Sequence, residues 1–242
     1  MRLVGPAFIA LLVLTTVASA QSLDLPIPPI HFGDQIPDYG PEDSEDEANE
    51  DPRDTPPPTI YGEEIDTETD TIIYVLDVSC SMGWDSQSYT TLDGTISQGP
   101  RIDRAKAELA RSIMGLSDNF RFNIVAYDCS VRQWKRSMVE ANDGNKQDAI
   151  TWASGLSPAG ATATGPGTAL GLADKANTSI VLLTDGMPNC GADGYAGHRS
   201  MISSANSQGA KINVFGIAAS GSYRAFCQGV AGDSGGSYFD IP

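Results

Sequence analysis

The sequence predicts an α/β domain of the doubly wound class, with a mostly parallel six-stranded sheet flanked by helices and one antiparallel edge strand. Three observations predict this fold. Continuous apolar runs alternate with stretches of helical periodicity, small polar residues follow the apolar runs directly, and the length of 242 residues suits one domain with attachments. Strands that are apolar on both sides are typical of a parallel sheet covered by helices on both faces.

The predicted strands and helices follow each other in order from Thr71 onward. The strands are expected at 72–76, 122–127, 180–183 and 212–217, with a return strand at 130–134 and a last strand near Tyr238. The helix at 101–116 has apolar residues at helical spacing and lies between Pro100 and a turn at Asn119. Further helices are expected at 148–156, 167–176, 199–207 and 222–230.

Residues 1–20 have the features of a signal peptide. Arg2 precedes an apolar run at 8–14, and Ala18-Ser19-Ala20 has the small-x-small pattern of a cleavage site. We therefore expect cleavage after Ala20 and a secreted or periplasmic product. The apolar run is shorter than the ~20 residues that a membrane helix needs, so no transmembrane segment is expected in the mature chain.

Residues 21–70 form an acidic, proline-rich stretch, which we expect to be a disordered linker before a folded domain at 71–242. Between positions 34 and 70 there are 15 Asp or Glu residues and Arg53 is the one basic residue. Such a segment cannot bury enough apolar surface to offset its ordering entropy. The formal net charge of −16 lies mostly in this stretch, and no cluster of Lys and Arg appears elsewhere. Nucleic acid is therefore excluded as an expected partner.

Oxygen-bearing side chains follow the predicted strands in three places. Asp77-Val78-Ser79-Cys80-Ser81 comes after the first strand, Thr162 and Thr164 lie in a Gly-rich loop at 160–170, and Asp185 follows the strand at 180–183. Doubly wound sheets bind ligands at the carboxyl ends of their strands. Two carboxylates that face each other there are unfavourable unless a cation lies between them. An all-oxygen ligand set favours Mg²⁺ or Mn²⁺, with Ca²⁺ also possible.

On these residues, the region 71–242 resembles the von Willebrand factor type A (VWA) domain, with its Rossmann-like fold and metal-ion-dependent adhesion site. Asp77, Ser79 and Ser81 match the D-x-S-x-S motif of that family, and Asp185 matches its T-D-G segment. The resemblance implies that the two serines ligate the cation directly and that the two aspartates act through metal-bound waters. Each match taken alone also fits a turn or a helix cap.

The threonine of the resemblance is ambiguous. Thr162 fits best because it follows Gly160-Ala161, where the family usually has two glycines, and Thr164 is the alternative. The resemblance implies a binding module without catalysis, in which an Asp or Glu of a protein partner completes the coordination of the metal. An alternative is a structural or assembly subunit with an incidental metal.

A secreted serine hydrolase is a third hypothesis, because Gly232-Asp233-Ser234-Gly235-Gly236 has the sequence that surrounds the nucleophile in chymotrypsin-like proteases. A serine nucleophile needs a base, and the chain has only His31 and His198, neither in a matching motif. We therefore expect no enzymatic activity.

The insertion at 82–99 contains the aromatic residues Trp84 and Tyr89. Aromatic side chains on a loop beside a site are candidate partner contacts, and their alternative role is to pack the loop onto the domain.

Four cysteines in an exported chain allow three pairings, and the sequence does not choose among them. The strand order of the resembled family implies Cys80 with Cys129 and Cys190 with Cys227. Buried free thiols are the alternative.

Overall fold

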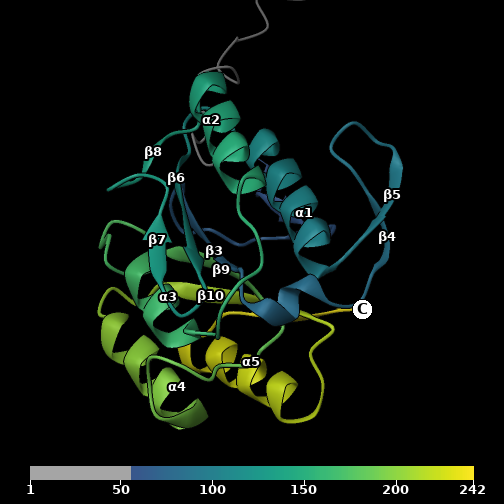
Figure 1. The fold of residues 1–242 in the computed structure, drawn as a ribbon. Coiled ribbons are helices and arrows are strands. Elements are labelled where there is room, and N and C mark those ends of the chain that lie inside the picture. The colour runs from purple at the N-terminus through teal and green to yellow at the C-terminus, as the bar shows by residue number, and fades with distance from the viewer. Residues whose placement is uncertain (1–55) are drawn as a thin grey trace, which may run out of the picture. The chain divides into compact units, whose positions relative to one another are not determined.

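The computed structural model describes residues 56–242 and centres on a seven-stranded sheet (Figure 1). Its strands are β3 (Thr71–Asp77), β6 (Arg121–Tyr127), β7 (Val131–Gln133), β8 (Val139–Glu140), β9 (Ser179–Thr184), β10 (Lys211–Ile217) and β11 (Tyr238–Ile241). The order across the sheet is β11-β10-β9-β3-β6-β7, and β8 also pairs with β6. The predicted α/β class is confirmed. The strand count is corrected from six to seven, because two short strands instead of one pair antiparallel with β6.

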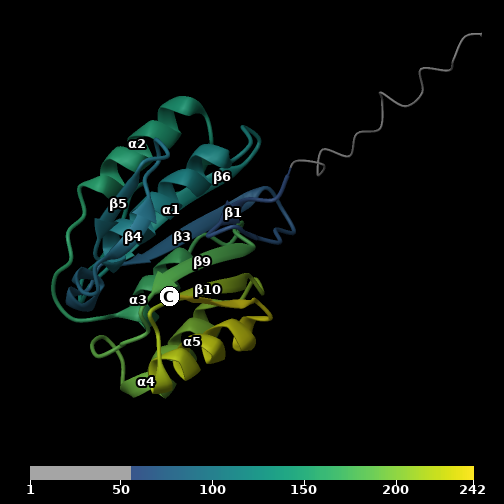
Figure 2. The same ribbon diagram turned by 90° about the vertical axis from the view of Figure 1, so that its right-hand side faces the viewer.

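In the described part of the chain, five α-helices cover the two faces of this sheet (Figure 2). Helices α1 (Arg101–Gly115) and α2 (Asp143–Ser154) pack on one face, and α3 (Thr164–Gly171), α4 (Gly194–Ala205) and α5 (Gly221–Ser234) pack on the other. Each layer has its own apolar core because β3, β6, β9 and β10 send alternate side chains to opposite faces. Within residues 56–242, no helix has both the length and the apolar character that a bilayer crossing needs.

Three helices begin three to five residues before their predicted starts. The side chain of Asn142 accepts the backbone N–H of Asn145 (3.0 Å) and so caps α2, whose polar first turn hides its start from apolar periodicity. Helix α3 contains Pro166 in its first turn, where a proline is tolerated because that N–H has no intrahelical partner. Helix α4 begins at Gly194 instead of position 199.

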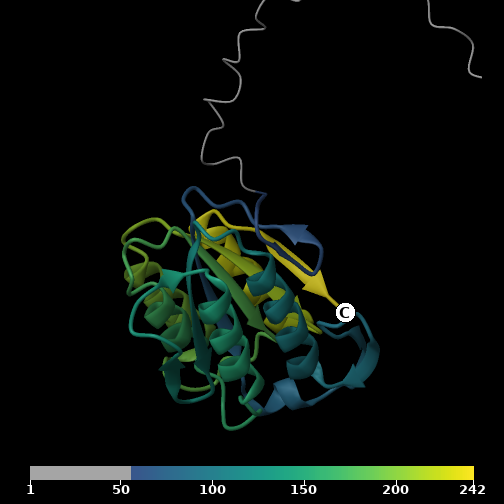
Figure 3. The same ribbon diagram turned by 90° about the horizontal axis from the view of Figure 1, so that it is seen from above.

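The folded domain begins before Thr71. Strands β1 (Thr59–Ile60) and β2 (Glu63–Glu64) form an antiparallel hairpin, and Ile60 and Ile65 are buried in the core. In the view of Figure 3 the hairpin appears next to the C-terminal strand β11, and the ring of Tyr61 stacks on Phe215 of β10 at 6.0 Å between centroids. The expected linker therefore ends earlier than position 70, because two isoleucines anchor this acidic segment. The predicted signal peptide and residues 21–55 lie outside the described residues.

The insertion between β3 and α1 is structured. It consists of a short 3-10 helix, η1 (Cys80–Gly83), and a hairpin of β4 (Gln87–Thr90) and β5 (Ile96–Gly99). Figure 1 shows this hairpin projecting beside α1. Its base is closed by a hydrogen bond from the backbone N–H of Arg101 to the carbonyl of Trp84 (3.1 Å).

Candidate metal-binding site at the strand ends

Asp77 and Asp185 lie at the carboxyl ends of β3 and β9, which are neighbouring parallel strands. Leu76 of β3 is in register with Leu183 of β9, so the residues that follow them reach the same edge of the sheet. Both aspartates are almost completely inaccessible to solvent. The expectation that these two carboxylates share one edge of the sheet is therefore met by the topology.

The Asp77 carboxylate is held by three donors. Its Oδ1 accepts the backbone N–H of Ser79 (2.8 Å), and its Oδ2 accepts the hydroxyls of Thr184 (2.7 Å) and Tyr127 (3.3 Å). Burial first, and then the negative charge of Asp185, raise the pKa of Asp77 from 3.8 to about 7, although the hydrogen bonds from Ser79 and Thr184 lower it. The site thus contains a carboxylate that is fixed by hydrogen bonds and lies close to a second negatively charged group.

Ser79 and Ser81 place two buried hydroxyls next to this carboxylate. Their Oγ atoms lie 3.3 Å apart, because the chain turns from β3 directly into η1. Within residues 56–242 no three His, Cys, Asp or Glu side chains gather as metal ligands, so the donors available here are hydroxyls supported by two carboxylates.

The Gly-rich loop lies against the motif that follows β3. Two backbone bonds join them: the N–H of Ala159 donates to Val78 (2.8 Å) and the N–H of Cys80 donates to Gly160 (3.1 Å). The hydroxyl of Thr164 is engaged with Tyr127 (3.4 Å) at the start of α3. The backbone of Thr162 is fixed from the other side, since its N–H donates to the side chain of Asn189 (2.8 Å).

Arg101 is a site residue that sequence reasoning missed. It is buried, and its guanidinium donates from Nη1 to Asp185 Oδ2 (2.8 Å) and from Nη2 to the carboxylate of Asp85. The signal was a basic residue at the first position of a helix, where the helix dipole disfavours a positive charge. A cation placed there needs a nearby anion, and Asp185 provides it.

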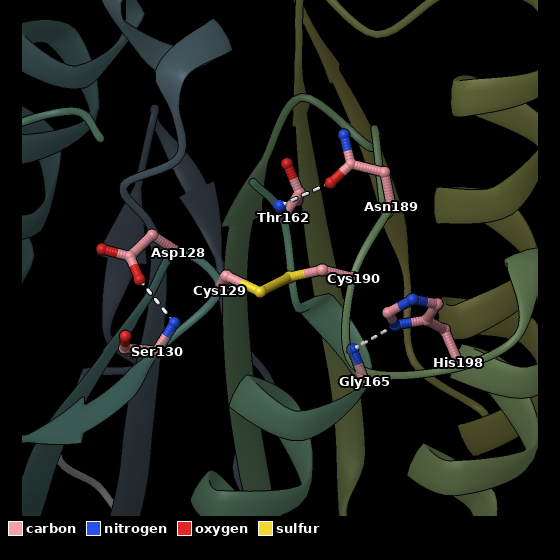
Figure 4. Close-up of a disulfide and its surroundings, with 8 residues drawn as sticks. All are labelled: Asp128, Cys129, Ser130, Thr162, Gly165, Asn189, Cys190 and His198. Atoms are coloured by element: carbon pink, nitrogen blue, oxygen red, sulfur yellow. Dashed lines mark hydrogen bonds between the residues drawn. A yellow bond between two sulfur atoms is a disulfide. The ribbon is translucent and has the colours of Figure 1, made fainter. Parts of the chain in front are cut away.

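The observed disulfide joins Cys129 to Cys190 (Figure 4), so the predicted pairs Cys80–Cys129 and Cys190–Cys227 are wrong. The prediction assumed that bridges connect the ends of adjacent strands. The bridge instead joins the loop after β9 to the loop after β6, and these two strands are not neighbours because β3 lies between them. Cys80 is an exposed free thiol, and Cys227 is a buried one.

The disulfide fixes the loop that carries Thr162. The backbone N–H groups of Asn189 (2.9 Å) and Cys190 (3.2 Å) both donate to the carbonyl of Thr162. Figure 4 shows Asn189 pointing toward Thr162 next to the bridge. The cysteines thus serve the geometry of the candidate site, by a route that the predicted pairing did not foresee.

Ser234 is not arranged as a nucleophile. It ends α5, where its hydroxyl donates to the carbonyl of Ala231 (2.9 Å) and accepts the N–H of Ile212 (3.0 Å). His198 is buried and its Nδ1 accepts the N–H of Gly165 (2.8 Å), so the lone pair of that nitrogen is occupied and cannot take a proton from a serine. His31 lies outside the described residues.

The residues present fit a hard divalent cation. Asp185 Oδ1 is buried and has no hydrogen-bond partner within the described part of the chain, while its Oδ2 is held by Arg101. An unpaired carboxylate oxygen beside two hydroxyls is a donor set that Mg²⁺ and Mn²⁺ accept, with water completing the coordination. A bound cation would also relieve the repulsion between Asp77 and Asp185.

Comparisons with known proteins define the class of this domain. Residues 94–240 match the sequence model of the von Willebrand factor type A domain. The chain therefore belongs to the VWA family. This match begins after the Asp77–Ser81 motif, so it identifies the fold and makes no statement about a metal.

Among curated proteins, the mouse inter alpha-trypsin inhibitor heavy chain 4 is 28% identical over 141 residues, which is 53% of this chain and 13% of that protein. The human von Willebrand factor A domain-containing protein 3B is 28% identical over 102 residues, which is 42% of this chain and 8% of that protein. The chain thus spans a small part of the length of these relatives.

Solved structures share the fold. A VWA protein from Catenulispora acidiphila superposes with a TM-score of 0.57 at 19% identity, covering 74% of this chain and 40% of that chain. The pilus adhesin SpaC from Lactobacillus rhamnosus GG gives 0.56 at 15% identity, covering 74% and 28%. An aerotolerance-related membrane protein from Bacteroides fragilis gives 0.53 at 19% identity, covering 71% and 91%.

Proposed function

We propose that this domain binds one divalent cation, Mg²⁺ or Mn²⁺, and through it an Asp or Glu side chain of a protein partner. Ser79 and Ser81 would hold the ion directly, Thr162 would join from the Gly-rich loop, and Asp77 and Asp185 would fix its waters. The protein would work outside the cytoplasm, secreted or periplasmic, after cleavage behind Ala20. This is a binding function without catalysis.

The convergence of carboxylates and hydroxyls at one sheet edge carries the proposal. Ser79, Thr184 and Tyr127 donate hydrogen bonds to the two oxygens of Asp77, and these contacts fix the orientation of the carboxylate. Asp185 keeps one buried oxygen without a partner. Buried polar atoms in folded proteins almost always have a partner, so a bound cation or its water would explain the unpaired oxygen of Asp185.

The attraction for a partner carboxylate follows from how few negatively charged ligands the protein would provide to the ion. A divalent ion held mainly by hydroxyls and water keeps enough positive charge to attract a carboxylate from outside. The buried network of Asp77, Thr184 and Tyr127 fixes the segment that carries the serines, because Asp77 also accepts the backbone N–H of Ser79.

Calorimetric titration with Mn²⁺ tests the metal site. The wild-type protein is expected to bind one ion, and Ser79→Ala with Ser81→Ala is expected to weaken binding at least about tenfold. Thr162→Ala is expected to weaken it, whereas Thr164→Ala leaves it within about threefold because that hydroxyl faces Tyr127. Unchanged affinity in the double serine variant would contradict the assignment.

Partner capture with and without a chelator tests the second half of the proposal. Metal-dependent binding is expected to disappear in chelator and in the double serine variant. Trp84 and Ile96 are 54% and 81% exposed on the insertion, which favours a second candidate, an assembly subunit that binds through its own apolar surface. Capture that survives chelator and is lost in Trp84→Ala would support that candidate.

A further inference from the structure

Arg101 joins two aspartates that come from different parts of the chain. Its Nη1 lies 2.8 Å from Asp185 Oδ2 at the candidate metal site, and its Nη2 contacts Asp85 in the insertion. The side chain of Arg101 is 10% exposed and that of Asp185 1%, so their ion pair is shielded from solvent. Asp85 is half exposed, and its φ of 52° is a left-handed conformation that aspartate tolerates better than most residues.

The guanidinium gives the site a positive charge before any metal arrives. Without it, Asp77 and Asp185 would be two buried carboxylates with no cation between them, which is costly. With it, the site offers less net negative charge to an incoming ion. Asp85 acts in the opposite sense, because it draws part of the charge of Arg101 away from Asp185.

We propose that Arg101 is a tethered counter-ion that lowers the affinity of the site for divalent cations, and that Asp85 sets the strength of this effect. The inference rests on the proposed metal site and deepens it. A weakly held ion retains more of its charge for the carboxylate of a partner, so the same arginine favours capture of the partner over tight storage of the metal. Arg101 is a positioning residue and does not itself touch the ion.

The two variants at this ion pair are expected to move metal affinity in opposite directions. Arg101→Gln removes a positive charge next to the site and is expected to tighten Mn²⁺ binding about tenfold. Asp85→Asn leaves the whole guanidinium charge to Asp185 and is expected to weaken Mn²⁺ binding about threefold. General damage to the site would weaken binding in both variants, so the opposite signs distinguish the charge effect from misfolding.

Matched controls lie at a second arginine–aspartate pair. Arg199 donates to both carboxylate oxygens of Asp233 (2.7 and 2.6 Å) between α4 and α5. Arg199→Gln and Asp233→Asn change the net charge equally and should leave the affinity unchanged. Arg101→Lys keeps the charge and should stay within about threefold of wild type.

Thermal unfolding provides a readout that does not need the partner. In chelator, Arg101→Gln should melt below wild type because its carboxylates are uncompensated, and Mn²⁺ should raise its midpoint by more than it raises that of wild type. If Arg101→Gln does not fold, Asp85→Asn carries the test alone, since it changes an exposed side chain.

The outcomes separate this inference from the proposed function. If wild type binds Mn²⁺ and loses it in the double serine variant, while Asp85→Asn and Arg101→Gln bind as wild type or both bind more weakly, the counter-ion role is overturned and the metal site stands. If wild type binds no Mn²⁺, both are overturned.

Discussion

Gly186 fixes the chain direction directly after Asp185. It has a φ of +78°, and a Cβ at this position would lie 2.8 Å from the sulfur of Cys227 and 2.8 Å from the carbonyl oxygen of Tyr223. The backbone of α5 therefore approaches the T-D-G segment so closely that only glycine fits. The side chain of Thr184 completes the turn by accepting the N–H of Gly186 (3.0 Å).

Gly186→Ala is expected to destabilise the protein by about 2–4 kcal/mol, through backbone strain and the clash with α5. Gly209→Ala is the matched control, because Gly209 has a similar φ of +72° and open space around its Cβ position. The control should cost only about 1 kcal/mol. Urea denaturation of the two variants measures the difference, and equal losses would contradict the role given to the close approach.

His198 makes the stability of the domain sensitive to acid. Burial lowers the pKa of His198 below its usual 6.5, and its Nδ1 accepts the N–H of Gly165 at the start of α3. Protonation would remove that acceptor and place a positive charge at the N-terminus of a helix. The neutral form is therefore favoured in the folded state.

Because the folded pKa lies below the unfolded one, the contribution of His198 is complete above pH 6.5 and is lost as the pH falls toward the folded pKa. Between pH 7.5 and 5.5, we expect wild type to lose more unfolding free energy than His198→Asn, which keeps an acceptor but does not titrate. Urea denaturation at both pH values tests this. A variant and wild type with the same pH dependence would contradict it.

At the scale of elements, the disulfide and the N-terminal hairpin each fix a part of the fold. The Cys129–Cys190 bridge closes a loop of 61 residues and ties the loops after β6 and β9 together. The β1–β2 hairpin extends the core with Ile60 and Ile65.

Removing the bridge is expected to cost about 4 kcal/mol, as for a closed loop of this length. The variant Cys129→Ser with Cys190→Ser tests this against Cys80→Ser, whose exposed thiol should contribute less than about 0.5 kcal/mol. Mass spectrometry of peptides from unreduced protein identifies the pairing directly. A Cys80–Cys129 peptide would contradict the structure.

The hairpin is expected to belong to the stable domain. Ile60→Ala should cost about 2–5 kcal/mol because Ile60 is 1% exposed, whereas Ile96→Ala, at a side chain 81% exposed, should stay within about 0.5 kcal/mol. Chemical denaturation compares the two. Similar values would place the start of the domain at Thr71, where the composition of the sequence had put it.

For the molecule as a whole, the sequence predicted what depends on local pattern. Apolar runs predicted the parallel strands, and the ends of those runs predicted the positions of Asp77 and Asp185. Both features depend only on short stretches of sequence. The disulfide, the ion pair of Arg101 and the burial of Ile60 depend on how loops cross the domain. The linker predicted from composition wrongly included residues 59–65, because two isoleucines among acidic residues do not show a periodic pattern.

The same contrast explains the insertion. The β4–β5 hairpin is short and carries few alternating apolar residues, so the sequence showed only a loop with aromatic side chains. The insertion is connected to the candidate site at its base, where Trp84 and Asp85 both contact Arg101. Asp85 and Trp84 precede Arg101 by 16 and 17 positions, so these two contacts depend on the placement of α1 and cannot be predicted from local sequence.

Anomalous diffraction from crystals grown with Mn²⁺ tests the central claim most directly. We expect a single peak within about 2.2 Å of the Ser79 and Ser81 hydroxyls, with Asp185 Oδ1 facing a water bound to the ion. An empty map at this position in crystals that contain Mn²⁺, or a peak only at other surface carboxylates, would contradict the account.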